Sequence, residues 1–499
     1  MELQFRKTIC SCLKQAVHEV KNLEQTQEVR LPDSMPDISR ILGAWGQLIM
    51  RGKEWRSDRI LSNAGMMVWV LYAPEDGTEP RCVDTWVPLQ MEWDLQDTDR
   101  EGTIRVWWMP RFVDARSVSP RKIMLRLGVA ALGQAHVPME ADIFVPDEVP
   151  EMVELLRRTY PVTLDKEAGE KAFVLDEDLM LPPSCPGAEK LLYYTIQPEV
   201  SDCKVMADKL AFRGNANLHV LYRSEEGMLH SCDLELPFSQ FTELDGSYGK
   251  DVSADVTMGV TGLELELDPE GHLRLKCGLV AQHLIRDKVP VELVEDAYCT
   301  DRDYELRTRQ LDLPAVLDVR SDNINATQNL PGSGSRIVDT AFLPDFPRVR
   351  RKDDVAEMDL PGMFQVLYYD DEGALQSGSG RWEGQWSMKA APESCVNVSV
   401  IPAGRPQAVL TGNGIDLRGD LQIQTGTVSA GMLPMVAGMD LGEKKKVPSN
   451  RPSVILRRCE REPLWNLAKE YGSTVAAIKE ANRLLEEPDA MRFLLIPVR

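Results

Sequence analysis

The side chains that most often carry chemistry, histidine and cysteine, are scattered along this chain. The six histidines are His18, His136, His219, His230, His272 and His283. No two of them have the spacing that would place two metal ligands on one face of a helix. Cys10 and Cys12 lie close together, but two thiolates do not complete a metal site. We therefore interpret these residues as structural or surface groups, and a site assembled from residues distant in sequence is the alternative.

Other motifs that could perform chemistry are incomplete. Gly332–Ser335 does not lead into a Gly-Lys-Ser/Thr sequence or a helix, so a phosphate-binding loop is not expected. Trp69, Trp107 and Trp108 are interpreted as core and rim aromatics rather than as a stacking platform. The sequence therefore predicts a protein that is not an enzyme, with no catalytic residue, no metal and no cofactor.

The length and charge of the chain limit its class. Its 499 residues have room for three or four domains, and the 43% hydrophobic content can build their cores. A formal net charge of −21 disfavours binding to nucleic acid or an anionic membrane. Residues 444–499 carry a net charge of +5, which leaves −26 on residues 1–443. No apolar run has the length of a signal peptide or a membrane span, so a cytoplasmic protein without membrane insertion is expected.

One sequence pattern occurs twice, 150 residues apart. Leu31–Pro36 reads Leu-Pro-Asp-Ser-Met-Pro, and Leu181–Pro186 reads Leu-Pro-Pro-Ser-Cys-Pro. In both copies the first leucine is followed 39 residues later by Val-Leu-Tyr, at Val70–Tyr72 and Val220–Tyr222. A third Val-Leu-Tyr lies at Val366–Tyr368. Self-similarity at a long period indicates an array of one kind of module.

The elements around each Val-Leu-Tyr read as strands. Each tripeptide is followed by an acidic turn with glycine, at Gly77, Gly227 and Gly373, and then by a second apolar run, as in a β-hairpin. Short strands with regular turn signals predict a mainly β fold of tandem β-sandwich-like modules, followed by a small α+β domain. The segment Phe5–Leu23 fits either a helical stripe or a strand.

The third copy departs from the other two. We take its Leu-Pro to be Leu313-Pro314, which lies 53 residues before Val366 instead of 39. The excess contains Pro331–Ser335, interpreted as a loop insertion. The predicted organisation is given by five ranges. They are modules at 1–150, 151–300 and 301–430, a linker at 431–452, and a C-terminal domain at 453–499.

The C-terminal domain has the clearest local signals. Val454–Leu456 reads as a strand, and Pro463 precedes an apolar helical face that ends at Gly472. Ser473 or Thr474 can cap a second helix, and a short apolar strand ends at Pro497. The predicted order is strand, helix, helix, strand.

This C-terminal segment resembles a LysM domain. The resemblance rests on Leu464–Gly472, then Thr474-Val475, Ile478, Asn482, Leu484 and Leu495–Pro497. It departs from the family in the two glycan-binding loops, where Arg461-Glu462-Pro463 and Asp489–Arg492 stand instead of the usual residues. We therefore expect these loops to contact a protein. The candidate partner-binding residues are Arg461, Glu462, Trp465, Asn482 and Arg492.

The rest of the chain resembles the SPOCS domain of spore-coat-associated proteins from sporulating Firmicutes. The resemblance rests on Leu31-Pro32, Pro36–Ile38 and the strand that ends in Val-Leu-Tyr. Such modules followed by one LysM resemble the SipL-type morphogenetic proteins of clostridia. The resemblance implies a mother-cell cytoplasmic adaptor that tethers the coat to the forespore, with the basement-layer ATPase or another coat morphogenetic protein as partner. The alternative is a peptidoglycan- or cortex-binding protein.

Overall fold

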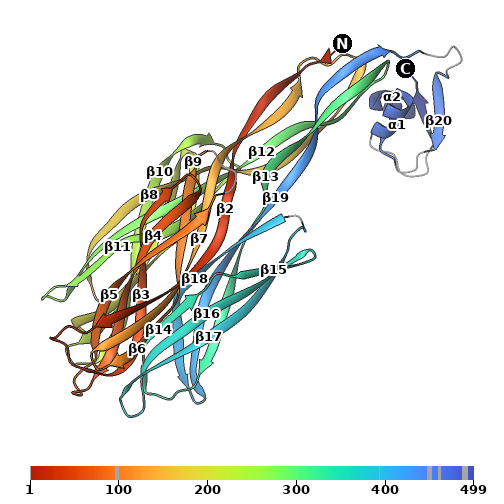
Figure 1. Ribbon diagram of the computed structural model, residues 1–499. Helices are drawn as coiled ribbons and strands as arrows, with labels where there is room; N and C mark the ends of the chain where they lie inside the picture. The colour runs from red at the N-terminus through yellow and green to blue at the C-terminus, as the bar shows by residue number, and fades with distance from the viewer. Residues whose placement is uncertain are drawn as a thin grey trace.

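Antiparallel strands form almost all of the molecule. The computed structural model describes residues 2–95, 100–392, 394–446, 452–458, 462–485 and 493–498. Figure 1 shows a broad β body, a narrower stalk of long strands that rises from it, and a small unit with two helices beside the end of the stalk. The prediction of a mainly β fold is confirmed.

The first unit of the body spans residues 5–146. Its strands are β2 (Phe5–Arg30), β3 (Ile38–Trp55), β4 (Arg59–Pro74), β5 (Arg81–Asp94), β6 (Thr103–Ser119) and β7 (Lys122–Pro146). They form two sheets, in the orders β3-β4-β5 and β2-β7-β6. The two sheets enclose one apolar core, as in a β-sandwich.

The second unit, residues 153–299, pairs its strands in a related way. Its strands are β8 (Val153–Met180), β9 (Ala188–Ser224), β10 (Leu229–Tyr248), β11 (Val252–Leu267) and β12 (His272–Cys299). The long first and last strands, β8 and β12, pair with each other as β2 and β7 do, and β12 also pairs with β11. The β9–β10 hairpin covers them.

The third unit, residues 302–444, repeats the pairing of its first and last strands. Its strands are β13 (Arg302–Leu330), β14 (Arg336–Pro344), β15 (Arg348–Lys352), β16 (Val355–Tyr369), β17 (Leu375–Lys389), β18 (Ser394–Thr411) and β19 (Gly414–Lys444). Here β13 pairs with β19, and β19 with β18. The short β1 (Glu2–Leu3) also pairs with β19, which ties the start of the chain to the third unit. The domain boundaries themselves stay predictions.

The Val-Leu-Tyr tripeptides lie on corresponding strands, β4, β9 and β16. Each valine and each tyrosine packs into the core of its own unit. Because side chains alternate along a strand, each leucine must face the other way. Leu71, Leu221 and Leu367 meet in one further core that all three units share, with side chains such as Trp45, Trp69, Leu192 and Val338. The tripeptide therefore joins each unit to the other two.

A second shared core holds the stalk together. The outer halves of the ribbons β2–β7, β8–β12 and β13–β19 contribute small groups of apolar side chains to it. Its members include Cys10, Cys12, Ile143, Val162, Leu164, Leu293, Leu311, Leu313 and Met435. The three units thus form one closed body with a common interior, where the sequence indicated only an array.

The assignment of Leu313-Pro314 as the third Leu-Pro copy is wrong. Leu313 lies inside β13 and packs into the stalk core. The first two copies instead follow the ends of β2 and β8, at turns. Leu330-Pro331 holds that place after β13, 149 residues beyond Leu181 and 36 before Val366. The segment Pro331–Ser335 is a loop, as expected, but it is the motif itself and not an insertion.

The structure decides one open alternative and corrects part of the predicted linker. Phe5–Leu23 is strand, because β2 carries one buried side and one wet side; Cys10, Cys12 and Val17 are buried while Ile9 is exposed. The predicted linker 431–452 is strand as far as Lys444, since β19 stays paired with β13 up to Arg302. Low charge there reflects buried positions such as Met435 and Met439. Residues 447–451 of the linker lie outside the described part of the chain.

The C-terminal unit, called the tail below, has the predicted order. It consists of β20 (Val454–Arg458), α1 (Leu464–Tyr471), α2 (Val475–Asn482) and β21 (Phe493–Pro497), with β20 and β21 antiparallel. Gly472 ends α1 with φ of 63°, in the left-handed region that glycine tolerates. Thr474 caps α2, since its hydroxyl accepts the Ala477 N–H at 3.1 Å. Within the described residues, neither helix has the length and apolarity to cross a membrane.

Candidate functional sites in the tail and between the units

The tail is docked on the end of the second unit through Trp465. The indole Nε1 donates to Asp296 Oδ2 at 2.8 Å, and the ring meets Tyr298 edge to face with centroids 4.8 Å apart. Lys469, one helical turn later, pairs with the same carboxylate at 2.7 Å. The Tyr298 hydroxyl donates to the Ser473 carbonyl at 2.9 Å. The predicted contact residue Trp465 thus faces the body of its own chain.

A β-bulge aims Asp296 at the tail. Val294 pairs with Arg157 and Asp296 with Leu156, so Glu295 is an extra residue in β12. A bulge bends its strand and re-aims the neighbouring side chains. Tyr298 also belongs to the apolar core of the tail, with Leu464, Leu467 and Ile496. The docking contact is therefore a continuation of the tail core onto the body.

The other predicted contact residues have structural partners or lie outside the described residues. Asn482 closes the tail, since its amide donates to the carbonyls of Ile478 and Leu495 and its oxygen accepts the Leu495 N–H at 2.8 Å. Glu462 pairs with Arg457 at 3.2 Å. Arg461 and Arg492 lie outside the described part of the chain. A role of these residues in partner binding stays a prediction.

An exposed apolar face lies on the outer side of the two-stranded tail sheet. Leu456 is 63% exposed and lies directly opposite Leu495, which is 43% exposed. Val454 and Phe493 extend the same face, with exposures of 47% and 62%. We call these four residues the tail patch. An isolated exposed leucine is ordinary, but a contiguous group of large apolar side chains marks an interaction surface.

The three units are joined at their rim by a ring of arginines. Arg40 of the first unit donates to the Leu375 carbonyl of the third at 2.8 Å. Arg336 of the third unit donates to the Leu229 carbonyl of the second at 2.8 Å. Arg223 of the second unit pairs with Glu79 of the first. The accepting residues Glu79, Leu229 and Leu375 each lie nine positions after the valine of the Val-Leu-Tyr in their own unit. Each unit therefore accepts an arginine of a neighbouring unit at the equivalent sequence position.

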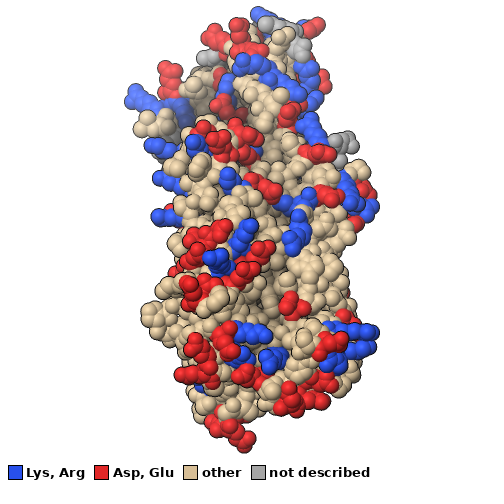
Figure 2. Space-filling view, turned by 90° about the vertical axis from the view of Figure 1, so that its left-hand side faces the viewer, with Lys and Arg blue, Asp and Glu red and all other residues tan. Residues whose placement is uncertain are grey.

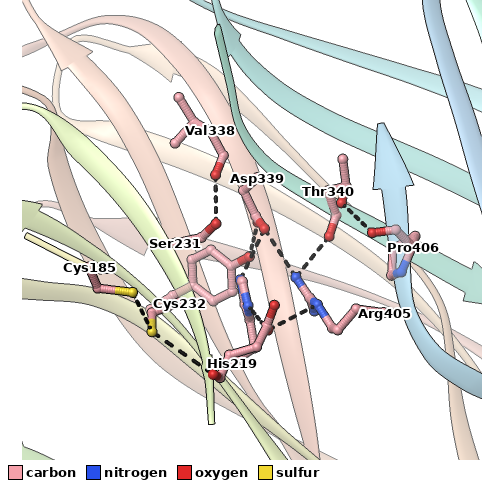
Figure 3. Close-up of polar contacts among 11 residues, drawn as sticks. Cys185, His219, Ser231, Cys232, Val338, Asp339, Thr340, Arg405 and Pro406 are labelled. Atoms are coloured by element: carbon pink, nitrogen blue, oxygen red, sulfur yellow. Dashed lines mark hydrogen bonds and ion pairs between the residues drawn. The ribbon is translucent and has the colours of Figure 1, made fainter. Parts of the chain in front are cut away.

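A buried ionic cluster lies where the second and third units meet (Figure 3). His219 contacts two carboxylates, with Nδ1 2.7 Å from Asp233 and Nε2 3.0 Å from Asp339. Arg405 approaches the same two carboxylates at 3.3 and 3.1 Å, and the Tyr193 hydroxyl donates to Asp339. Asp339 is buried, so its contacts with His219 and Arg405 offset the cost of burying its charge, whereas Asp233 is about half exposed.

The cluster shifts the pKa values of its members. Burial alone would lower the pKa of His219, but the charge of Asp339 and the hydrogen bond with Asp233 raise it. Burial would raise the pKa of Asp339, but His219 and Arg405 lower it to about 2. Burial beside Asp339 raises the pKa of Tyr193. The arrangement favours the protonated form of His219 and links the second unit to the third.

A cavity of about 300 Å³ adjoins this cluster. All three units line it, with Trp45 and Gln47 from the first, Gln197 from the second, and Phe342 and Gln422 from the third. Gln47 is already satisfied, since its oxygen accepts the Ile196 N–H at 2.8 Å and its amide donates to Leu48 O. The same is true of the Gln197 amide, which donates to the Pro402 carbonyl at 2.9 Å. These amides join the units to one another.

One acidic turn in the described residues groups potential metal ligands, namely Asp268, Glu270 and His272. Asp268 accepts the backbone N–H groups of Glu270 and His272 at 2.9 and 2.8 Å. These bonds are those of a capped β-turn between β11 and β12, which accounts for the clustering. Trp69 and Trp108 are buried, in agreement with the interpretation of these residues as core aromatics.

Charge is distributed without a dominant patch on the face that Figure 2 shows. Lys and Arg side chains alternate with Asp and Glu along the length of the molecule there.

Comparison with known families supports part of the sequence interpretation. Residues 188–268 match the SPOCS domain of the SipL family. The matched range covers β9, β10 and β11 in the second unit. The match supports a SipL-like protein with a role in sporulation or the spore coat. Searches of curated proteins and of solved structures find no match to the chain.

Sequence reasoning missed the tail patch, although a signal was present. Residues 493–496 are four consecutive apolar residues, Phe-Leu-Leu-Ile, in a sheet of two strands. Two short helices can cover one face of such a sheet, so alternate residues must face outward. Leu494 and Ile496 are buried, and Phe493 and Leu495 are exposed.

Proposed function

We propose that this protein is a non-enzymatic adaptor in endospore coat assembly, in which the three-unit body is a rigid platform and the tail carries the partner contact. The SPOCS match supports a role in sporulation. The observation that carries the proposal is the tail patch, an exposed apolar surface on the tail. We propose that the tail patch binds the coat basement-layer ATPase or another coat morphogenetic protein.

The tail is proposed to be a LysM-like domain. Its strand–helix–helix–strand order and the closing role of Asn482 support this assignment. The predicted loop residues Arg461, Glu462 and Arg492 stay candidate contact residues on the strength of the sequence. Trp465 would serve in docking to the body, because its indole already bonds Asp296.

The partner surface is proposed to be a protein surface with apolar and acidic groups. Apolar side chains gain most from burial against a complementary apolar surface, while cell-wall glycans present mainly hydroxyl groups. The exposed Arg458 lies opposite Phe493 on β20 and adds positive charge to the edge of the tail patch. We place the protein in the mother-cell cytoplasm, at the forespore surface.

Substitution in the tail patch tests this proposal. We expect Phe493→Ser to weaken retention of the purified basement-layer ATPase by about thirtyfold, which is the loss of one hot spot of about 2 kcal/mol. Phe241→Ser is the matched control, because Phe241 is an exposed strand phenylalanine on the body, at 58%. Equal binding by both variants and the parent chain would show that the tail patch is not the contact.

A further inference from the structure

Two cysteines of the second unit lie in direct contact. Cys185 Sγ and Cys232 Sγ are 2.9 Å apart, roughly 0.9 Å more than a disulfide bond. Both are present as free thiols. They are distant in sequence, since Cys185 belongs to the Leu-Pro turn after β8 and Cys232 to β10. Figure 3 shows the two sulfur atoms facing each other at the edge of the ionic cluster.

The backbone on both sides of this pair is anchored. The Cys185 N–H donates to the Pro182 carbonyl at 2.8 Å, which closes the turn. The Tyr222 hydroxyl donates to the Pro186 carbonyl at 2.9 Å and holds the turn against β9. Cys232 is paired with Val220 in the β9–β10 ladder. The two sulfur atoms are thus held together by elements that are fixed independently of any bond between them.

The other units place different side chains at these two positions. The first unit has the same turn, with Met35 N–H donating to Pro32 O at 2.9 Å, and Met35 packs against a core that contains Val83. Val83 pairs with Val70 as Cys232 pairs with Val220. In the third unit the fifth residue of the motif is Gly334, and Gly378 pairs with Val366. The fold therefore accepts an apolar pair or two glycines here, and the thiols are specific to the second unit.

We propose that Cys185 and Cys232 form a redox modification site, a reversible disulfide that ties the Leu-Pro turn of the second unit to β10. The oxidant is a low-molecular-weight disulfide such as oxidised glutathione. Half-buried Cys185 attacks one glutathione sulfur as its thiolate and releases one glutathione. Cys232 then attacks the Cys185 sulfur and releases the second. Two protein thiols lose two protons and two electrons, and the oxidant becomes two glutathione thiols.

The second step, in which Cys232 attacks the sulfur of Cys185, is the slow one. Burial, with the adjacent Cys185, raises the pKa of Cys232 to about 12, so its thiolate is scarce at neutral pH. We expect bridge formation to accelerate as pH rises. Reduction by a dithiol reverses it.

The test uses the full chain with oxidised or reduced glutathione, followed by alkylation and non-reducing peptide mapping. We expect a linked Cys185–Cys232 peptide pair, a mass lower by two hydrogens, and a melting temperature higher by roughly 5 °C, because the bridge closes a long loop without moving its ends. The Cys232→Val variant should instead retain glutathione on Cys185.

The control is the double variant Cys185→Met with Cys232→Val, which copies the pair of the first unit. It should fold and should show no change in melting temperature with oxidised glutathione. The proposal is overturned if the parent chain keeps glutathione on Cys185 without a bridge, if Cys185 links elsewhere, or if oxidation lowers the melting temperature.

Discussion

The three-unit body and the tail are stabilised in opposite ways. The body has a core within each unit and further cores that side chains of different units share, so no unit covers all its apolar side chains alone. The tail has one small core, to which the body adds Tyr298. The body can therefore act as a rigid platform, whereas the tail is joined to it by a few contacts around Trp465.

The largest effect should come from the shared core of the body. Leu221→Ala removes a fully buried side chain at the meeting point of the three units and should lower the free energy of unfolding by about 2–5 kcal/mol. Because the core is shared, all three units should lose protection from amide exchange. Val174→Ala, at a 58% exposed position, is the control and should change little. Loss of protection in the second unit alone would show that the units are independent.

A smaller effect should separate the tail from the body. Trp465→Phe keeps the aromatic packing but removes the hydrogen bond to Asp296, at a cost of about 1 kcal/mol. Amide exchange should become faster in α1 and in the end of β12, and should be unchanged in the shared core of the body. Unchanged exchange in α1 would argue against this docking contact.

A comparable effect should distinguish the units from one another. Tyr72 and Tyr222 each donate to a proline carbonyl of the Leu-Pro turn, at 3.0 and 2.9 Å. The third motif lacks its second proline, and within the described residues the Tyr368 hydroxyl has no such bond. Tyr222→Phe should therefore cost about 1 kcal/mol in urea unfolding, and Tyr368→Phe close to nothing. Equal costs would contradict this difference between the motifs.

The smallest effect should be pH-dependent and should arise at the ionic cluster. The folded-state pKa of His219 is raised above its unfolded value, so its contribution to stability is present below about pH 6.5. That contribution is lost as pH rises through the folded pKa. The stability difference between the parent chain and His219→Gln should therefore shrink from pH 6 to pH 9 in thermal unfolding. A stability difference that grows from pH 6 to pH 9 would contradict the predicted loss of the His219 contribution with rising pH.

Much of the fold could be predicted because its signals are local. The hairpin glycines Gly77, Gly227 and Gly373 all have positive φ, and the tail elements begin and end near their capping residues. The shared cores were missed because they depend on packing between units. The signal was the uninterrupted apolar run of Val-Leu-Tyr, which indicates a strand buried on both faces. The third Leu-Pro was misplaced because Leu313-Pro314 has the same two residue types but lies inside β13. Leu330-Pro331 has the same residue types and also lies at the turn after the first long strand, as in the other two units.

The candidate site was predicted less well for a physical reason. Loop residues were chosen by resemblance, whereas exposure depends on which sheet face the helices cover. Trp465 looks like a contact residue in sequence, but Asp296 and Tyr298, some 170 positions earlier, cover it. No periodicity within the tail could have shown that contact.

The most direct measurement of the proposed adaptor role is a paired assay with the full chain and with the Phe493→Ser variant. One arm measures retention of purified basement-layer ATPase, and the other measures sedimentation with purified peptidoglycan. Saturable retention of the ATPase by the parent chain, lost in the variant, with no sedimentation in either, is the predicted result. Saturable sedimentation with peptidoglycan and no retained ATPase would contradict it.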